Sequence, residues 1–128
     1  GVPEVLAGLS LAGYRLYVAT VKPTSIAEKV LADFRLRNHF SGVAGASMGP
    51  ERRDKASIIA HALERFDLDA GHSLMVGDRR QDIDGARENG LAAIGVTYGF
   101  GSREELDSAR PAEIVEHSSE IATLLLAD

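Results

Sequence analysis

Two aspartates that stand four residues apart carry the clearest chemical signal in the sequence. They lie in the run Val76-Gly77-Asp78-Arg79-Arg80-Gln81-Asp82-Ile83-Asp84-Gly85-Ala86. We expect Asp78 to project from the end of a strand and Asp82 to follow in the first helical turn, which directs both carboxylates toward one cation. Mg²⁺ usually takes one or two protein carboxylates and completes its octahedron with water and phosphate oxygens. The pair therefore predicts a magnesium site. Asp84 is interpreted as a carboxylate that only complements the positive end of the helix dipole, and a second interpretation gives Asp82 the same role.

Thr20, Val21 and Lys55 are of types that could bind an anion. Thr20 ends an apolar run, and Pro23 is suited to open a helix, whose unpaired amides and dipole favour negative charge. The Thr20 hydroxyl and the Val21 amide are therefore predicted to bind phosphate, unless Thr20 only ends the strand or caps the helix. Lys55 stands at a predicted helix start, where a cation is slightly unfavourable. It is a candidate phosphate ligand and catalytic residue, the alternative being a solvated lysine.

Other reactive residue types give no comparable pattern. The four histidines show no metal-ligand spacing, and no serine lies in a Gly-x-Ser-x-Gly elbow. We interpret the histidines as structural or surface residues, and the sequence argues against a serine hydrolase.

Apolar runs alternate with amphipathic segments, which predicts the elements that must position these residues. Strands are expected at 16–19, ending at Thr20, and at 42–45, 73–76, 91–96 and 113–115. Helices are expected at 3–11, 23–34, 54–66, 81–88, 102–106 and 121–126. The second helix is expected to face the core with Ile26, Ala27, Val30, Leu31 and Phe34, and the strand at 73–76 to be buried.

Strands that are apolar on both faces and alternate with helices predict an α/β fold, a parallel sheet with helices on both sides. Such sheets bind ligands at the carboxyl ends of their strands. Thr20, Asp78 and the segment before Lys55 would all lie at that edge.

Length and composition predict one domain that spans residues 1–128. The formal charge of −5 and the scattered basic residues argue against nucleic acid, and the absence of cysteine fits a reducing compartment. No apolar run approaches the roughly 18 residues that span a bilayer, and the start lacks a signal-like segment. We expect a cytoplasmic protein without a membrane partner. Because the sequence begins with Gly1 rather than Met, we expect it to be part of a longer protein.

Three of these segments, in this order, resemble the later motifs of the haloacid-dehalogenase (HAD) superfamily. Val18–Pro23 is similar to motif II, Lys55 to motif III and Gly77–Asp82 to motif IV. Together with 85–90 and 96–102, the Gly-Asp-x-x-x-Asp run resembles the phosphoglycolate phosphatase branch. The resemblance covers nearly the whole chain and implies a three-layer α/β/α, Rossmann-like core.

The resemblance implies a magnesium-dependent phosphomonoester hydrolase that acts on a small phosphorylated metabolite such as 2-phosphoglycolate, through an aspartyl-phosphate intermediate. Thr20 would bind a phosphate oxygen together with the Val21 amide, and Lys55 would neutralise developing charge. Asp78 would ligate Mg²⁺. Asp82 would belong to the metal site by orienting Lys55 or a metal-bound water.

The sequence departs from the family pattern in two places. Val21 stands where many relatives have asparagine, which removes a polar side chain but keeps the amide. Motif I, the Asp-x-Asp of a first strand that supplies the nucleophile, is absent, and so is the helical cap. In the family that strand lies between those ending at Thr20 and Asp78, so two central edges would be open. The missing N-terminal segment or a second copy of the chain is expected to complete the sheet, and the chain alone is expected to be inactive.

Several activities share these motifs. A haloacid dehalogenase has the same fold and lysine but needs no Mg²⁺ and usually lacks the Gly-Asp-x-x-x-Asp pattern. Phosphosugar mutases and pyrophosphatases differ mainly in the cap. A catalytically inactive interaction module, such as a receiver-like domain, is the alternative of a different class, although the acidic pair that ends a receiver's first strand is not seen.

Overall fold

Helices and strands alternate along the whole chain in the computed structural model, which describes residues 2–47, 52 and 54–126. The helices are α1 (Val2–Leu11), α2 (Thr24–Asp33), α3 (Lys55–Arg65), α4 (Arg80–Glu88), α5 (Arg103–Ala109) and α6 (Ser118–Leu126). The strands are β1 (Tyr17–Pro23), β2 (Gly42–Ala46), β3 (Leu74–Gly77), β4 (Ala92–Val96) and β5 (Glu113–Val115). Each predicted element is present, which confirms the α/β prediction.

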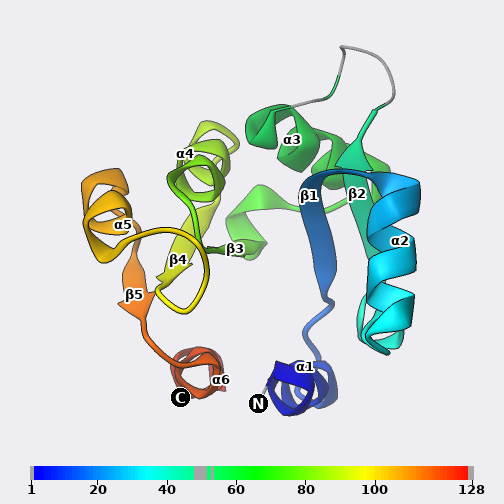
Figure 1. Cartoon of the computed structure of the whole chain (residues 1–128), viewed down its shortest axis with the longest axis horizontal. Helices are drawn as coiled ribbons and strands as arrows, with labels where there is room; N and C mark the ends of the chain where they lie inside the picture. The colour runs from blue at the N-terminus through cyan, green and yellow to red at the C-terminus, as the bar shows by residue number, and fades with distance from the viewer. Residues whose placement is uncertain (1, 48–51, 53, 127–128) are drawn as a thin grey trace.

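The strands form two separate parallel sheets. β1 pairs with β2, with Tyr17 opposite Gly42, and β3, β4 and β5 form the second sheet in that order. Figure 1 shows β1 and β3 as the neighbouring strands of the two sheets. Within the described residues, neither of these two strands is paired on the side that faces the other sheet. The arrangement agrees with a parallel sheet that lacks one strand between β1 and β3.

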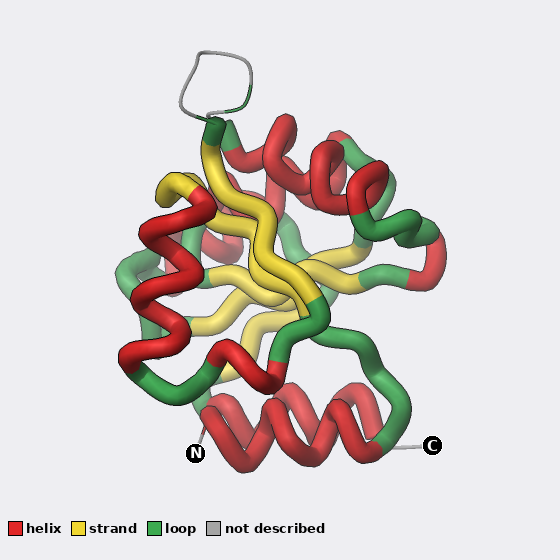
Figure 2. Tube along the Cα trace, turned by 90° about the vertical axis from the view of Figure 1, so that its right-hand side faces the viewer, coloured by secondary structure: helices red, strands yellow, loops and turns green. Residues whose placement is uncertain are grey.

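Helices cover the strands on both sides and join the two sheets (Figure 2). α3 packs on β1, β2 and α4, and α4 packs on β3 and β4. The main buried cluster joins Ile59, Ile83 and Leu106 and contacts Ala19 of β1. Burial of such side chains, each worth about 1.5–3 kcal/mol, holds the halves together without backbone pairing between them.

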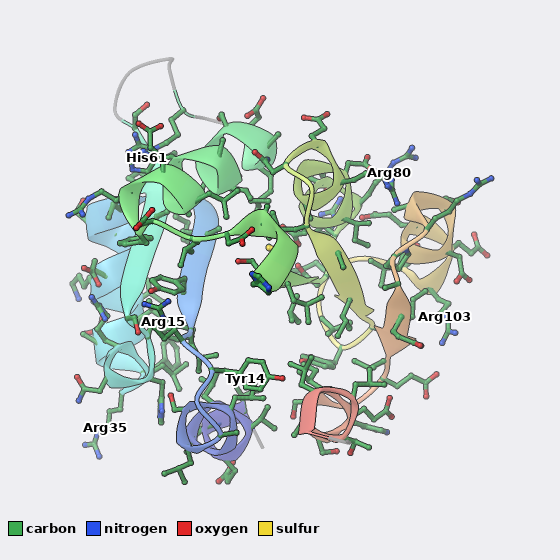
Figure 3. All side chains as sticks on the ribbon, turned by 180° about the vertical axis from the view of Figure 1, so that it is seen from behind. Tyr14, Arg15, Arg35, His61, Arg80 and Arg103 are labelled. Carbon is green, nitrogen blue, oxygen red and sulfur yellow. The ribbon has the colours of Figure 1, made fainter. Side chains whose placement is uncertain are left out.

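α1 and α6 form a second connection between the two halves. Leu9 of α1 packs with Ile94 of β4 and Ile121 of α6 in one buried cluster. The Tyr14 hydroxyl donates a hydrogen bond to the carbonyl of Leu125 at 2.9 Å. Figure 3 shows the Tyr14 ring reaching from the end of α1 toward α6. None of the helices in the described part of the chain is long and apolar enough to span a bilayer.

β1 extends beyond the predicted end at Thr20. It continues to Pro23, with an irregular register between Ala19 and Pro23. The residue before a proline avoids helical dihedrals, and this restriction keeps the backbone extended rather than ending the strand. Pro23 is the N-cap of α2, whose first residue is Thr24.

Two burial predictions are wrong. On α2, Ala27 is buried, but Ile26 and Phe34 are 51% and 72% exposed, so only part of the predicted apolar stripe faces the sheet. In β3, Val76 is 38% exposed although it was expected to lie in a buried strand. β3 is open on the side that faces β1, and a strand covered by only one neighbour buries less of its surface.

Candidate active site

Lys55 is held between the two sheets by a mostly buried ion pair. Asp54 caps α3, because its Oδ1 accepts a hydrogen bond from the Ser57 amide at 2.8 Å, and this makes Lys55 the first helical residue. The Lys55 Nζ lies 2.7 Å from Asp82 Oδ1 and donates to the carbonyl of Ala19 at 2.9 Å. The side chains of Lys55 and Asp82 are only 13% and 7% exposed. The unfavourable position of this cation at a helix start is thus offset by a carboxylate and a carbonyl.

Asp82 uses both of its oxygens within the protein. While Oδ1 pairs with Lys55, Oδ2 accepts hydrogen bonds from the amides of Asp78 and Arg79 at 3.1 and 3.2 Å. These amides lie at the start of α4, where unpaired donors favour a carboxylate. Of the two roles suggested by the sequence, this geometry favours orientation of Lys55 over direct metal ligation.

Gly77 leaves the space that the Asp82 side chain occupies. A Cβ atom at position 77 would overlap the Asp82 side chain, with Asp82 Cγ 2.5 Å away. The neighbouring atoms belong to the short, bonded stem of a fixed carboxylate, so they cannot move without disturbing the ion pair. The sequence marks this glycine only as a strand end.

We expect Gly77→Ala to lower the free energy of unfolding by about 1–3 kcal/mol, the usual cost of overpacking a fixed site. Gly8→Ala is the control, since a Cβ there meets nothing within 4 Å and Ala is favoured over Gly in a helix by about 1 kcal/mol. Urea denaturation of each variant measures both changes. Equal effects of the two substitutions would contradict the role of space at Gly77.

Asp78 is fixed by the glycine-rich loop that follows β4. Its Oδ2 accepts a hydrogen bond from the Phe100 amide at 2.8 Å, and a Cβ at either Gly99 or Gly101 would overlap Asp78 atoms. Its other oxygen, Oδ1, receives no hydrogen bond from the described residues. Asp78 is half-buried. It therefore offers one carboxylate oxygen to a ligand, and the sequence does not show that the loop at 98–101 would hold it.

A groove of about 380 Å³ brings these groups together between β1 and β3. Lys55, Asp78 and Asp82 line it along with Tyr98, and its walls include Ala19, Met75, Val76, Gly77, Val96 and Gly99. Burial, and then the negative charge of Asp78, raises the pKa of the Tyr98 hydroxyl. Lys55 reaches Ala19, where the regular pairing of β1 with β2 ends, and Asp82 binds the amide that follows β3. The groove therefore lies beside the irregular part of β1 and the carboxyl end of β3.

Thr20 and Val21 lie beside the groove but do not line it. The Thr20 hydroxyl accepts a hydrogen bond from the Lys22 amide at 3.2 Å, and the Val21 side chain is 55% exposed. The neighbouring residue, Ala19, is the part of β1 that reaches Lys55. The structure thus brings together three of the four predicted side chains, and Thr20 directly follows Ala19, which lines the groove.

Arg79 and Arg80 are paired with other carboxylates. Glu105 Oε2 accepts hydrogen bonds from Arg79 Nε at 2.9 Å and from the Arg80 amide at 2.7 Å. The hydrogen bond that Arg79 donates to Glu105, followed by the negative charges of Glu105, Asp78 and Asp82, raises the pKa of Arg79. The Arg80 amide and the Arg79 side chain lower the pKa of Glu105. Sequence inspection did not single out Glu105.

The donor set fits part of a magnesium site. Among the described residues, no three His, Cys, Asp or Glu side chains are grouped so that they could hold a metal ion. Asp78 Oδ1 is a hard anionic oxygen of the type that Mg²⁺ prefers. The described residues would therefore supply one carboxylate, and the remaining ligands would come from water, a substrate or another segment.

Several known proteins are similar to this chain. The chain is 43% identical over 111 residues to a 5'-nucleotidase of Pseudomonas aeruginosa, covering 87% of the chain and 50% of the relative. It is 36% identical over 125 residues to a phosphoglycolate phosphatase of Neisseria gonorrhoeae, covering 93% and 53%. The chain thus spans about half the length of these curated relatives. The crystal structure of a predicted phosphatase from Clostridium acetobutylicum superposes with a TM-score of 0.95 at 37% identity, covering 98% of the chain and 58% of that structure.

The family comparison covers the part of the chain that carries most of the groove. A family model described as HAD-hydrolase-like matches residues 53–121, which include Lys55, Asp78 and Asp82. With the parallel strands and the carboxyl-end groove, this match confirms the resemblance seen in the sequence. The chain belongs to the HAD-hydrolase-like family.

Proposed function

We propose that this chain is a large part of the catalytic core of a magnesium-dependent phosphomonoester hydrolase. The observation that carries the proposal is the position of the Lys55–Asp82 ion pair beside Asp78, at one groove between β1 and β3. One cation and one carboxylate oxygen at the same groove suit a phosphate group and its accompanying metal ion. Such reactions depend mainly on positioning and charge stabilisation, which fixed ionic groups supply.

Lys55, Thr20 and Val21 would bind the phosphoryl group. Asp82 and the Ala19 carbonyl hold the Lys55 ammonium in one place, so its charge needs no reorganisation as negative charge develops. The Thr20 hydroxyl and the Val21 amide lie one and two residues beyond Ala19, in the irregular part of β1. Lys55 remains partly accessible at the groove and can approach a phosphate oxygen while it stays paired.

Asp78 would hold the metal through Oδ1, while the Phe100 amide keeps Oδ2 in place. Mg²⁺ bound there would supply positive charge to the phosphoryl oxygens. Asp82 would act on the metal site through Lys55 and through the amides of Asp78 and Arg79. Gly77 is needed because Asp82 occupies its side-chain space.

A strand inserted between β1 and β3 would supply the nucleophile. Within the part of the chain that the structure describes, neither strand has a partner strand on the side that faces the other, and an extended segment could pair with both. An aspartate at the carboxyl end of that strand would reach the groove and attack phosphorus, so that the ester P–O bond breaks, the alcohol leaves and an aspartyl-phosphate forms. Water would then hydrolyse this intermediate to inorganic phosphate and the free aspartate. A segment outside this sequence is the first candidate for the strand, and a second copy of the chain is the other.

A small phosphorylated metabolite is the proposed substrate, with 2-phosphoglycolate favoured. The relatives support the phosphomonoester class and differ within it, since one is named a 5'-nucleotidase and another a phosphoglycolate phosphatase. 2-Phosphoglycolate and a nucleoside 5'-monophosphate are therefore the two substrates to compare.

The test measures phosphate release by the 128-residue chain and by a complete protein that carries it. We expect the complete protein to release phosphate with Mg²⁺ and to stop when a chelator removes the metal. We expect negligible turnover from the 128-residue chain, because neither aspartate at the groove is available as the nucleophile. Asp82 is paired with Lys55, and Asp78 would hold the metal. Rapid Mg²⁺-dependent turnover by the chain alone would contradict the need for an added strand. Chelator-resistant release of halide from a 2-haloacid would instead indicate a dehalogenase.

A further inference from the structure

The two arginines that follow Asp78 are each held by a different carboxylate. Arg79 Nε lies 2.9 Å from Glu105 Oε2, and Arg80 Nε lies 3.1 Å from Asp84 Oδ2. Figure 3 places Arg80 on the side of α4 that faces α5. Neither guanidinium is paired with Asp78, although Arg79 adjoins it in the chain. Asp78 therefore keeps one oxygen without a hydrogen bond from the described residues.

The Glu105 carboxylate is held in place by contacts within α5 and at the start of α4. Ser102 caps α5 by accepting a hydrogen bond from the Glu105 amide at 3.0 Å, which sets the position of Glu105 in the first turn. Its Oε2 binds both the Arg79 side chain and the Arg80 amide. The Glu105 side chain is 25% exposed, whereas that of Arg79 is 47% exposed. The Glu105 carboxylate is thus the more buried partner, and it has a second hydrogen bond, from the Arg80 amide, that does not depend on the Arg79 side chain.

We propose that Glu105 is a positioning residue that keeps the Arg79 guanidinium away from Asp78 and so leaves Asp78 available to a divalent cation. This rests on the metal role proposed for Asp78. A released Arg79 has Asp78 as its adjacent carboxylate in the chain, and Asp78 Oδ1 receives no hydrogen bond from the described residues. A guanidinium bound to Asp78 Oδ1 would compete directly with a metal ion for the same oxygen.

The inference predicts that the effect of removing Glu105 depends on Arg79. Mn²⁺ binding to the complete protein that carries this chain is measured by electron paramagnetic resonance, with Mg²⁺ as competitor, in about 0.3 M salt to screen distant charges. We expect Glu105→Gln to weaken Mn²⁺ binding about two- to fivefold, the range of an exposed ion pair. Arg79→Gln added to that variant should restore the affinity, while Arg79→Gln alone should change it much less.

Glu104→Gln is the matched control, since it removes the same charge from the same turn of α5. Glu104 is exposed and makes no hydrogen bond or ion pair with the described residues, so we expect its variant to bind Mn²⁺ like the unaltered protein. Equal effects of Glu104→Gln and Glu105→Gln would overturn the inference. So would an Arg79→Gln effect of the same size in both backgrounds, because a simple charge effect is additive. Failure of the unaltered complete protein to bind Mn²⁺ would overturn the metal role of Asp78 as well.

Discussion

Asp78→Asn in the complete protein is expected to lower turnover of a phosphomonoester at least about 100-fold, mainly because Mg²⁺ is lost. The asparagine side-chain oxygen can still accept the hydrogen bond from the Phe100 amide, so the loop at 98–101 should keep its position. The substitution removes the negative charge from the one oxygen of Asp78 that is open to a cation. Catalysis should therefore fail while the fold persists.

Phosphate release as a function of Mg²⁺ concentration, with calorimetric Mg²⁺ binding beside it, measures this effect. Asp107→Asn serves as the control, because Asp107 is 63% exposed on α5 and lies 3.8 Å from Arg103 in a surface ion pair. Such pairs contribute at most about 1 kcal/mol to stability, and we expect unchanged turnover. An Asp78→Asn enzyme with the parent's Mg²⁺ dependence would refute the metal assignment, whatever its absolute rate.

Lys55→Met is expected to lower the free energy of unfolding by about 3–5 kcal/mol. The methionine fills much of the same space, but Asp82, only 7% exposed, loses the cation that lies 2.7 Å from its Oδ1. Asp82 would keep its two amide hydrogen bonds but would have no counter-charge. Most of the free energy lost on removing its carboxylate from water would then be uncompensated. The Ala19 carbonyl also loses its hydrogen-bond donor.

Lys29→Met provides the comparison for this prediction. Lys29 and Asp33 are 2.8 Å apart on α2, but their side chains are 76% and 59% exposed, so we expect a loss of about 0.5 kcal/mol or less. Urea denaturation followed by circular dichroism gives both values. Adding Asp82→Asn to Lys55→Met should recover part of the loss, because no unpaired charge then remains. Equal losses of unfolding free energy in the Lys55 and Lys29 variants would contradict a stabilising role for the buried Lys55–Asp82 pair between α3 and α4.

Local sequence signals predicted most of the secondary structure. Apolar runs bounded by glycine or aspartate marked β3 and β4, and Ser102 marked the start of α5, where its hydroxyl caps the helix. Asp54 gives a similar signal for α3 and was missed as a cap. These features depend on neighbours within one helical turn, which is why a sequence reveals them. The residue before a proline avoids helical dihedrals, and the sequence analysis took this as the end of β1 at Thr20. In the structure the same restriction keeps the backbone extended to Pro23.

What the sequence by itself determined is which groups stand at strand and helix ends: Thr20 after an apolar run, Lys55 at a helix start, and Asp78 and Asp82 around a strand end. Only the tertiary structure decided that Lys55 pairs with Asp82 and the Ala19 carbonyl, that the Phe100 amide holds Asp78, and that Thr20 lies outside the groove. The physical reason is distance along the chain. These contacts join residues up to 36 positions apart, and they form only after helices pack the two sheets side by side. The exposure of Val76 has the same origin, because strand burial depends on which neighbours the fold supplies.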